Sequence, residues 1–196
     1  EGLLLRADVT QRVQVSTMVD RLVTRFGRID RLVNNAGSPV ARSTLADLPE
    51  ATWDEALNVN LKGAFLCSQA TIPHRRRSGG GRIVNISSLV ARTGESSPHY
   101  AIAKAGVNAL TRALARELAP DGIAVNAVAP GLIDTPVHAK FAADPQAIFA
   151  RVVPRIPLGR PGTADEVASW IVFLSSADAG YVTGQVIEVN GGQLMA

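Results

Sequence analysis

Short apolar runs along this chain alternate with longer stretches in which apolar residues recur every three or four positions. The runs are rich in β-branched residues and fit buried strands, whereas the longer stretches fit helices with one apolar face. The pattern predicts strands over Leu3–Ala7, Ile29–Asn34, Arg82–Ser87, Ile123–Val128 and Gln185–Val189. It predicts helices over Val13–Phe26, from Thr52 to about Ile72, over Pro98–Leu118, and from Thr163 to about Leu174.

Local signals mark several helix ends. Thr52 with Glu55, and Thr163 with Glu166, have the spacing of capping boxes, and Gly27 is typical of a helix C-terminus. Helices of this length between strands act as crossover connections, which make the strands parallel. The sequence therefore predicts an α/β fold, a parallel sheet with helices on both faces.

The stretch from Pro136 to Pro161 shows no clear period and is too long for an ordinary connection. Loops of this length are usually lids or binding loops. Its bulky residues are mostly apolar, which favours a ligand with a hydrophobic portion: His138, Phe141, Ile148, Phe149 and Val152.

Composition narrows the classes of protein. The 196 residues suit a single domain, and 46% hydrophobic with 19% charged residues argues against a disordered tail or a coiled coil. No apolar run approaches the roughly 20 residues of a membrane helix, so no membrane association is expected. The single cysteine, Cys67, cannot form an internal disulfide, which favours the cytoplasm.

The charge balance gives little support to nucleic-acid binding. The net charge is only +3, and the run Arg75–Arg77 lacks interleaved aromatic residues. We interpret that run as a solvated surface turn. No nucleic-acid partner is expected.

The clearest candidate chemistry is a tyrosine four residues before a lysine. Tyr100 and Lys104 would share one face of the helix over Pro98–Leu118. A nearby cation lowers the pKa of a phenol from about 10, which lets it act as a general acid or base for a carbonyl–alcohol pair. An ordinary amphipathic helix with a surface lysine would show the same spacing.

Other polar residues follow predicted strands, where parallel sheets bind ligands. Ser87 and Ser88 could hydrogen-bond a substrate oxygen or simply cap a turn. The segments Asn34–Gly37 and Pro130–Thr135 also follow strands, and Gly37 permits close approach to a flat ligand. Plain turns remain the alternative for both segments.

Taken together, these motifs resemble the short-chain dehydrogenase/reductase family, and the resemblance covers nearly the whole chain. Each motif alone is weak, but their order and spacing are highly specific. Nearest in character are the 3-oxoacyl-acyl-carrier-protein reductases. The motifs are Asp8-Val9, Asn34-Asn35-Ala36-Gly37, Asn58-Val59-Asn60-Leu61, Ile86-Ser87-Ser88, Tyr100 with Lys104, Pro130-Gly131 with Thr135, and Thr183-Gly184-Gln185 with Asn190-Gly191-Gly192.

The resemblance implies a Rossmann-like, doubly wound fold and an NAD(P)-dependent oxidoreductase acting on a small carbonyl or alcohol substrate. Tyr100 would transfer the proton, and Lys104 would hold the nicotinamide ribose and lower the pKa of Tyr100. Ser88 would hydrogen-bond the reacting oxygen, although it stands one residue nearer Tyr100 than is usual, so Ser87 is the fallback. Asn60 would hold a water linking Lys104 to solvent.

The resemblance also implies a set of cofactor contacts for NAD or NADP, besides those of Tyr100 and Lys104. Asp8 and Val9 would contact the adenine, and Pro136 to Pro157 would form the substrate lid. The adenosine side would be lined by Asn34, Ala36 and Gly37. The nicotinamide end would be lined by Pro130, Gly131, Ile133 and Thr135, with Ile133 and Thr135 holding the carboxamide.

One departure from the family is large. The family's first strand, glycine-rich phosphate turn, helix and second strand do not precede Glu1, so the predicted sheet lacks its first two strands. Three explanations stay open: the chain is a fragment, Leu3–Ala7 slides beside Ile29–Asn34, or another chain supplies the segment. A catalytically dead scaffold is the alternative function. The resemblance further implies a homodimer or homotetramer.

Overall fold

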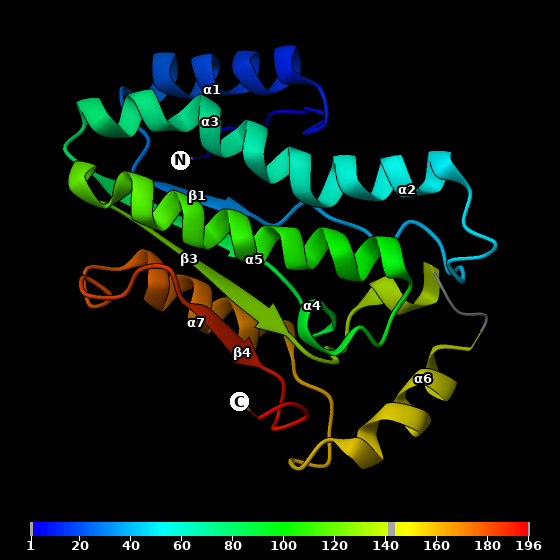
Figure 1. Cartoon of the computed structure of the whole chain (residues 1–196). Coiled ribbons are helices and arrows are strands. Elements are labelled where there is room, and N and C mark those ends of the chain that lie inside the picture. Colours follow the sequence, from blue (N-terminus) through cyan, green and yellow to red (C-terminus); the bar gives the residue numbers. More distant parts are fainter. Residues whose placement is uncertain (1, 141–143, 196) are drawn as a thin grey trace.

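Four parallel strands form the sheet at the centre of the computed structural model, which describes residues 2–140 and 144–195 (Figure 1). The strands lie in the order β1-β2-β3-β4. Their bounds are β1 Arg31–Asn34, β2 Gly81–Ile86, β3 Ile123–Pro130 and β4 Val186–Val189. The predicted Rossmann-like α/β class with a parallel sheet is confirmed.

Helices cover both faces of the sheet, but unequally. On one face, α3 (Gly63–Arg77) and α5 (Pro98–Leu118) pack on the strands, and α1 (Arg12–Phe26) packs behind α3. On the other face, α7 (Ala164–Ser175) packs against β2 and β3. The shorter elements are α2 (Glu50–Leu57), a π-helical turn (Asn58–Lys62), α4 (Val90–Thr93), α6 (Pro145–Val152), and 3-10 turns at Ala119–Asp121, Pro136–Lys140 and Val153–Arg155.

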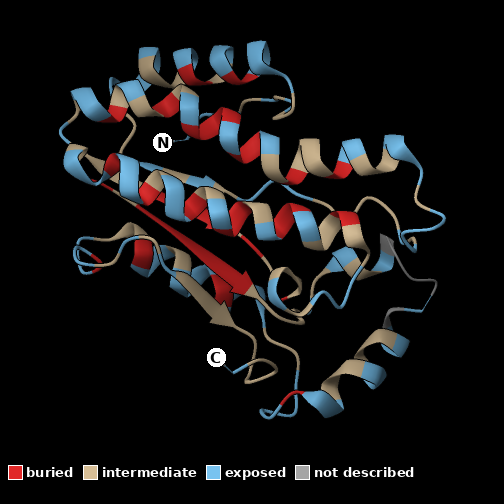
Figure 2. Ribbon diagram, in the orientation of Figure 1, coloured by how far each residue is buried: buried red, intermediate tan, exposed pale blue. Residues whose placement is uncertain are grey.

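The two central strands, β2 and β3, carry the core (Figure 2). Because side chains alternate along a strand, Ile83 joins the cluster under α5 whereas Val84 joins the cluster under α7. Both side chains are fully buried. The core therefore holds rigid the two strands whose carboxyl ends point toward the candidate site.

Most predicted elements are present with small shifts at their ends. Helix α5 has the predicted bounds, and Thr163 forms the predicted capping box with Glu166. The capping box at Thr52 is wrong: α2 starts at Glu50 behind Pro49, and Thr52 lies within its first turn. Proline has a fixed φ and no backbone N–H, so Pro49 precedes the first turn without leaving a donor unpaired.

The predicted strand over Leu3–Ala7 is also wrong. These residues form no regular element, and the side chain of Leu4 is 98% exposed. A strand is stable only when its backbone groups pair, and β1 pairs with β2 alone among the strands that the structure describes. The explanation in which Leu3–Ala7 slides beside β1 is therefore wrong.

The interpretation of Arg75–Arg77 as a solvated turn is wrong in part. The three residues form the last turn of α3, and Arg75 is fully buried. Its Nη1 donates to the carbonyls of Asp30, at 2.9 Å, and Arg82, at 2.8 Å. Burial lowers the pKa of Arg75 to about 10. Arg75 thus ties α3 to the chain that enters β1 and to β2.

The structure bears on two further points raised by the sequence, membrane-spanning helices and the state of Cys67. No helix within residues 2–140 and 144–195 is both long and apolar enough to cross a membrane. Cys67 is a free, buried thiol whose pKa is raised by burial. A buried thiol of raised pKa reacts slowly, so Cys67 serves packing.

Candidate active site

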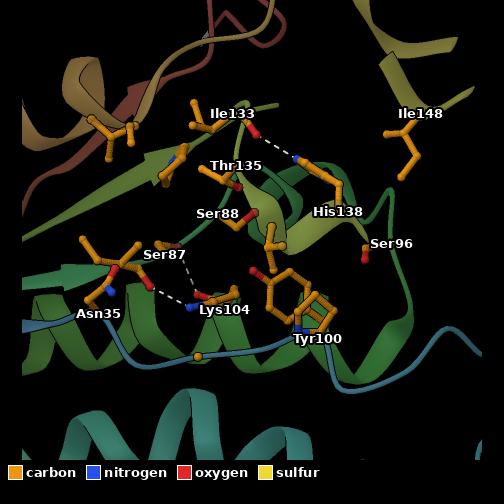
Figure 3. A pocket seen from close by; sticks show the side chains of 18 of the residues that line it. Asn35, Ser87, Ser88, Ser96, Tyr100, Lys104, Ile133, Thr135, His138 and Ile148 are labelled. Carbon is orange, nitrogen blue, oxygen red and sulfur yellow. Dashed lines mark hydrogen bonds between the residues drawn. The ribbon is translucent and has the colours of Figure 1, made fainter. Parts of the chain in front are cut away.

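A cavity of about 560 Å³ opens at the carboxyl ends of the strands. Figure 3 shows side chains from the residues that follow β1, β2 and β3, and from α5, converging on it. Its polar lining consists of Asn35, Arg42, Ser87, Ser88, Ser96, Ser97, Tyr100, Lys104, Thr135 and His138. This is the position where an open parallel sheet binds its ligand.

Helix α5 brings Tyr100 and Lys104 to the cavity on one face, as the four-residue spacing predicts. The Lys104 Nζ lies 5.7 Å from the centre of the Tyr100 ring. Lys104 is 4% exposed, and its Nζ donates to the Ile86 carbonyl at 2.8 Å. The lysine is therefore anchored to the end of β2 beside the phenol.

The electrostatics of this pair differ from expectation. Burial raises the pKa of Tyr100, and a side-chain hydrogen bond with Ser88 opposes that rise. Burial lowers the pKa of Lys104 to about 8. The expected lowering of the pKa of Tyr100 by Lys104 is absent, because desolvation outweighs the effect of a cation that lies over the ring instead of at the phenol oxygen.

The two serines after β2 take different positions. The Ser87 hydroxyl is buried and donates to the Lys104 carbonyl at 3.3 Å. The phenol oxygen of Tyr100 points toward Ser88 in Figure 3, and the Ser88 side chain acts to lower the pKa of that phenol. Of the two hydroxyls, that of Ser88 lies with the phenol, and that of Ser87 supports the helix.

Asn60 lies in the π-helical turn Asn58–Lys62 and is 2% exposed. Its Nδ2 donates to the carbonyls of Ser38 and Ala56, and its Oδ1 accepts from the Ser38 amide. These contacts engage both polar atoms of the Asn60 side chain and fasten the loop after β1 against the helix. The water that Asn60 is expected to hold stays a prediction.

Gly37 lies in that same loop and lines the cavity. A Cβ atom there would lie 2.7 Å from the Asn60 Oδ1 and 3.2 Å from the Lys104 Nζ. Only glycine fits between these two groups. The resulting close approach of backbone to Lys104 fits a site for a flat ligand group.

The segment after β3 supplies another side of the cavity through Pro130, Gly131, Ile133 and Thr135. The Gly131 amide donates to the Val189 carbonyl at 2.9 Å, and Ile133 bridges to Gly162. The next residues lead into the segment expected to form a lid. There, a His138 ring nitrogen bonds the Ile133 carbonyl at 2.8 Å, and Ile148 lines the cavity.

Comparison with known proteins gives consistent results. A family profile described as enoyl-(acyl carrier protein) reductase matches residues 1–193. A 3-oxoacyl-acyl-carrier-protein reductase of Thermotoga maritima is 46% identical over 98% of this chain and 79% of its own length. The cis-4-hydroxycyclohexanecarboxylate dehydrogenase of Sinomonas cyclohexanicum is 41% identical over 97% of this chain and 76% of its own length.

The chain belongs to the short-chain dehydrogenase/reductase family. The 3-oxoacyl-acyl-carrier-protein reductase of Staphylococcus epidermidis, 39% identical over 100% of this chain and 79% of its own length, is a further relative. Family membership supports an oxidoreductase that uses a nicotinamide dinucleotide.

Several residues expected to contact the dinucleotide do not line the cavity. The Asn34 amide is used inside the protein, where its Nδ2 donates to Asn85 Oδ1 at 2.8 Å and Ser68 Oγ at 3.1 Å. Asp8 accepts from the Thr10 amide and hydroxyl, as in a turn before α1. Val9 packs against α1 and α3, and Ala36 is absent from the lining.

Other lining residues were missed from the sequence. Asn35 faces the cavity where Asn34 does not, because consecutive residues at a strand end point to opposite sides. Arg42, Ser96 and Ser97 also line it. No periodicity or motif marks these three residues, since each lies in a connection whose path depends on tertiary contacts.

Proposed function

We propose that this chain reduces a carbonyl group to a secondary alcohol, or catalyses the reverse reaction, with Tyr100 as the general acid or base. The observation that carries the proposal is that Tyr100 and Ser88 line one cavity beside the buried amine of Lys104. Two hydroxyls and one amine converge in one cavity. A carbonyl oxygen placed between the hydroxyls would receive a hydrogen bond from each.

The protonation states suit the reductive direction. Because burial raises the pKa of Tyr100, the phenol keeps its proton at neutral pH and can donate it to a developing alkoxide. Lys104, with a pKa of about 8, is mostly protonated there.

The cavity has features that fit the nicotinamide end of a dinucleotide. Gly37 and Gly131 let backbone approach closely, and Lys104 offers donors for ribose hydroxyls. Ile133 and Thr135 line the same cavity, and we assign to them the carboxamide of the nicotinamide. When bound, the dinucleotide supplies or accepts the hydride. NAD and NADP both remain compatible with these residues.

The names of the relatives are consistent with this chemistry. One relative is named for a 3-oxoacyl substrate and another for a hydroxycyclohexanecarboxylate. Each name describes one side of an oxo–hydroxy pair. We extend that reaction class, and not either substrate, to this chain.

The chain contains a matched control for the test, because its two tyrosines differ in burial. Tyr181 is fully exposed and outside the cavity. With NADH or NADPH and a panel of apolar ketones, Tyr100→Phe is expected to lower turnover about a thousandfold. Tyr181→Phe is expected to keep the wild-type rate.

Two outcomes would contradict the proposal. Wild-type turnover in Tyr100→Phe would exclude the phenol as the proton donor. Absence of turnover by the unmodified chain with both dinucleotides would favour the scaffold instead. Titration of the chain with each dinucleotide, followed by protein fluorescence, separates loss of binding from loss of the proton donor.

A further inference from the structure

The cavity is lined by Arg42, Lys104 and His138, and no aspartate or glutamate belongs to the described lining. Lys104 donates to the Ile86 carbonyl, and His138 bonds the Ile133 carbonyl. Arg42 makes no hydrogen bond or ion pair with any residue that the structure describes.

Two arginines outside the lining are paired. Arg155 forms an ion pair with Glu95, and Arg160 with Glu166. A guanidinium presents planar donors that match the oxygens of a carboxylate or phosphate. An unpaired guanidinium at the mouth of a cavity without acidic groups is therefore suited to an anion.

The loop that carries Arg42 is held in a strained conformation. Val40 has a φ of 66°, which is unfavourable for a β-branched residue. Two local bonds shape this turn: the Val40 amide donates to Ser38 Oγ at 3.1 Å, and the Ala41 amide donates to the Pro39 carbonyl at 2.8 Å. Such strain persists only where the surroundings enforce it, and it gathers at functional sites.

Helix α5 supplies the enforcing contacts. The Ser43 amide donates to Ser97 Oγ at 3.0 Å. The fully buried His99 bonds the Pro39 carbonyl at 3.0 Å. A carbonyl only accepts, so His99 Nε2 carries the hydrogen, and the buried Nδ1 has no partner in the described part of the chain. These two contacts flank Arg42 and fix it beside the first turn of α5.

This turn of α5 also defines the end of the cavity at which Arg42 lies. Ser97, which holds the loop, precedes Tyr100 by less than one turn, and both line the cavity. In Figure 3, Ser96 and Ile148 lie on the side of Tyr100 away from Asn35 and Lys104. The side of Lys104 is proposed for the nicotinamide, so Arg42 belongs to the opposite end, which is left for the substrate.

We propose that Arg42 is a specificity residue that binds an anionic group, a carboxylate or a phosphate, on the substrate at a distance from the reacting carbonyl. This inference rests on the proposed function, because it assigns the substrate class of the same cavity. The reacting oxygen lies with Tyr100 and Ser88, whereas the anion lies with Arg42. A substrate that joins the two spans the substrate end of the cavity.

The test compares charged and neutral forms of one ligand by calorimetric titration of the full chain. The first pair is an apolar oxo acid and its methyl ester. The second pair is an acyl-CoA thioester and the same acyl thioester of N-acetylcysteamine. Tighter binding of the oxo acid than of its methyl ester would identify the anionic group as a carboxylate. Tighter binding of the acyl-CoA alone, with no difference in the first pair, would identify it as a phosphate.

We expect the chain to bind the anionic member of one pair about fivefold more tightly, or about 1 kcal/mol, as for a partly solvated ion pair. Arg42→Ala should abolish this preference, and Arg42→Lys should keep part of it. Arg21→Ala, which removes the same charge from the exposed side of α1, should leave the preference unchanged. The preference should shrink as salt is raised.

Equal binding within both pairs, a preference that survives Arg42→Ala, or no binding of any of the four ligands would overturn the inference. The measurement involves no turnover. Wild-type turnover in Tyr100→Phe would therefore not change the measured preference for the anionic ligands. Absence of that preference would likewise not change the result of the Tyr100→Phe turnover test.

Discussion

The two sides of the cavity are built differently. The side made by β2 and α5 is anchored in the core, where Ile83, Val84 and Lys104 are buried. The side made by Pro136 to Arg155 has no fully buried residue among its described side chains. It is held by the His138 bond to the Ile133 carbonyl, the His138–Phe149 ring contact and the Arg155–Glu95 ion pair.

This difference separates two tasks. Proton transfer needs groups at fixed positions, and the core provides that rigidity under Tyr100 and Ser88. Substrates of different shape need a surface that can adjust, and a segment with few buried contacts opens at low free-energy cost. We therefore assign proton transfer to the side made by β2 and α5. We assign the choice among substrates to the side made by Pro136 to Arg155.

The largest expected contrast compares the same substitution on the two sides. Ile83→Ala empties a fully buried site under α5, and we expect a loss of about 3 to 4 kcal/mol in the free energy of unfolding. Ile148→Ala, on the partly exposed α6, should cost less than about 1 kcal/mol and raise KM for apolar ketones. Chemical denaturation and steady-state kinetics measure both effects. Similar stability losses in the two variants would show that the two sides are equally anchored.

A smaller effect concerns the free-energy cost of burying the charge of Lys104 on the side of the cavity made by β2 and α5. The pKa of Lys104 is lowered from 10.5 to about 8 by burial, so the folded state binds this proton less tightly than the unfolded state. Removing the charge relieves that cost but loses the bond to the Ile86 carbonyl. We expect Lys104→Met to stabilise the fold by about 1 to 2 kcal/mol at pH 7 while abolishing turnover.

The pH dependence of this effect has a defined sign. The burial cost is complete below pH 8 and disappears as the pH rises toward 10.5, because the folded wild type loses the proton first. The stability difference between Lys104→Met and wild type should therefore shrink over that range. Denaturation at several pH values tests it, and a difference that grows with pH would contradict the assignment.

The smallest expected effect concerns the ion pair that attaches the segment from Pro136 to Arg155 to the rest of the protein. Arg155→Ala removes the exposed ion pair with Glu95, which should change global stability by less than about 1 kcal/mol. It should speed protease cleavage within Pro136 to Arg155, because local opening becomes easier. Arg28→Ala removes a comparable exposed pair with Asp30 and serves as the control. Equal cleavage rates in both variants would show that the Arg155 pair does not hold this segment.

Much of the fold could be predicted from the sequence because its signals are local. The bounds of α5 follow from Pro98 and from the apolar period that ends at Leu118. The Thr163 capping box uses contacts within one turn. Local signals gave a wrong prediction for Leu3–Ala7, because a strand depends on a partner that is distant in the sequence. They were also wrong at Thr52, because the helix begins earlier, directly after Pro49.

The candidate site was predictable to a smaller extent. Helical spacing alone predicts that Tyr100 and Lys104 share a face. The direction of the Tyr100 pKa shift depends on burial, which no spacing reveals. Asn34 and Asn35 are chemically identical, and only the strand's orientation decides that one bonds internally while the other faces the cavity. Phe141, expected in the lid, lies outside the described residues.

The π-helical turn at Asn58–Lys62 has a mechanical consequence. One extra residue in a helical rod rotates everything beyond it by about 100°, because each residue of an α-helix accounts for that angle. The rod can thus present one stripe to α5 along α2 and a different stripe to α1 and β1 along α3. The inserted residue lets the continuous helix over α2 and α3 pack against α5 with one half and against α1 and β1 with the other. Deleting it would rotate one half away from its packing partner.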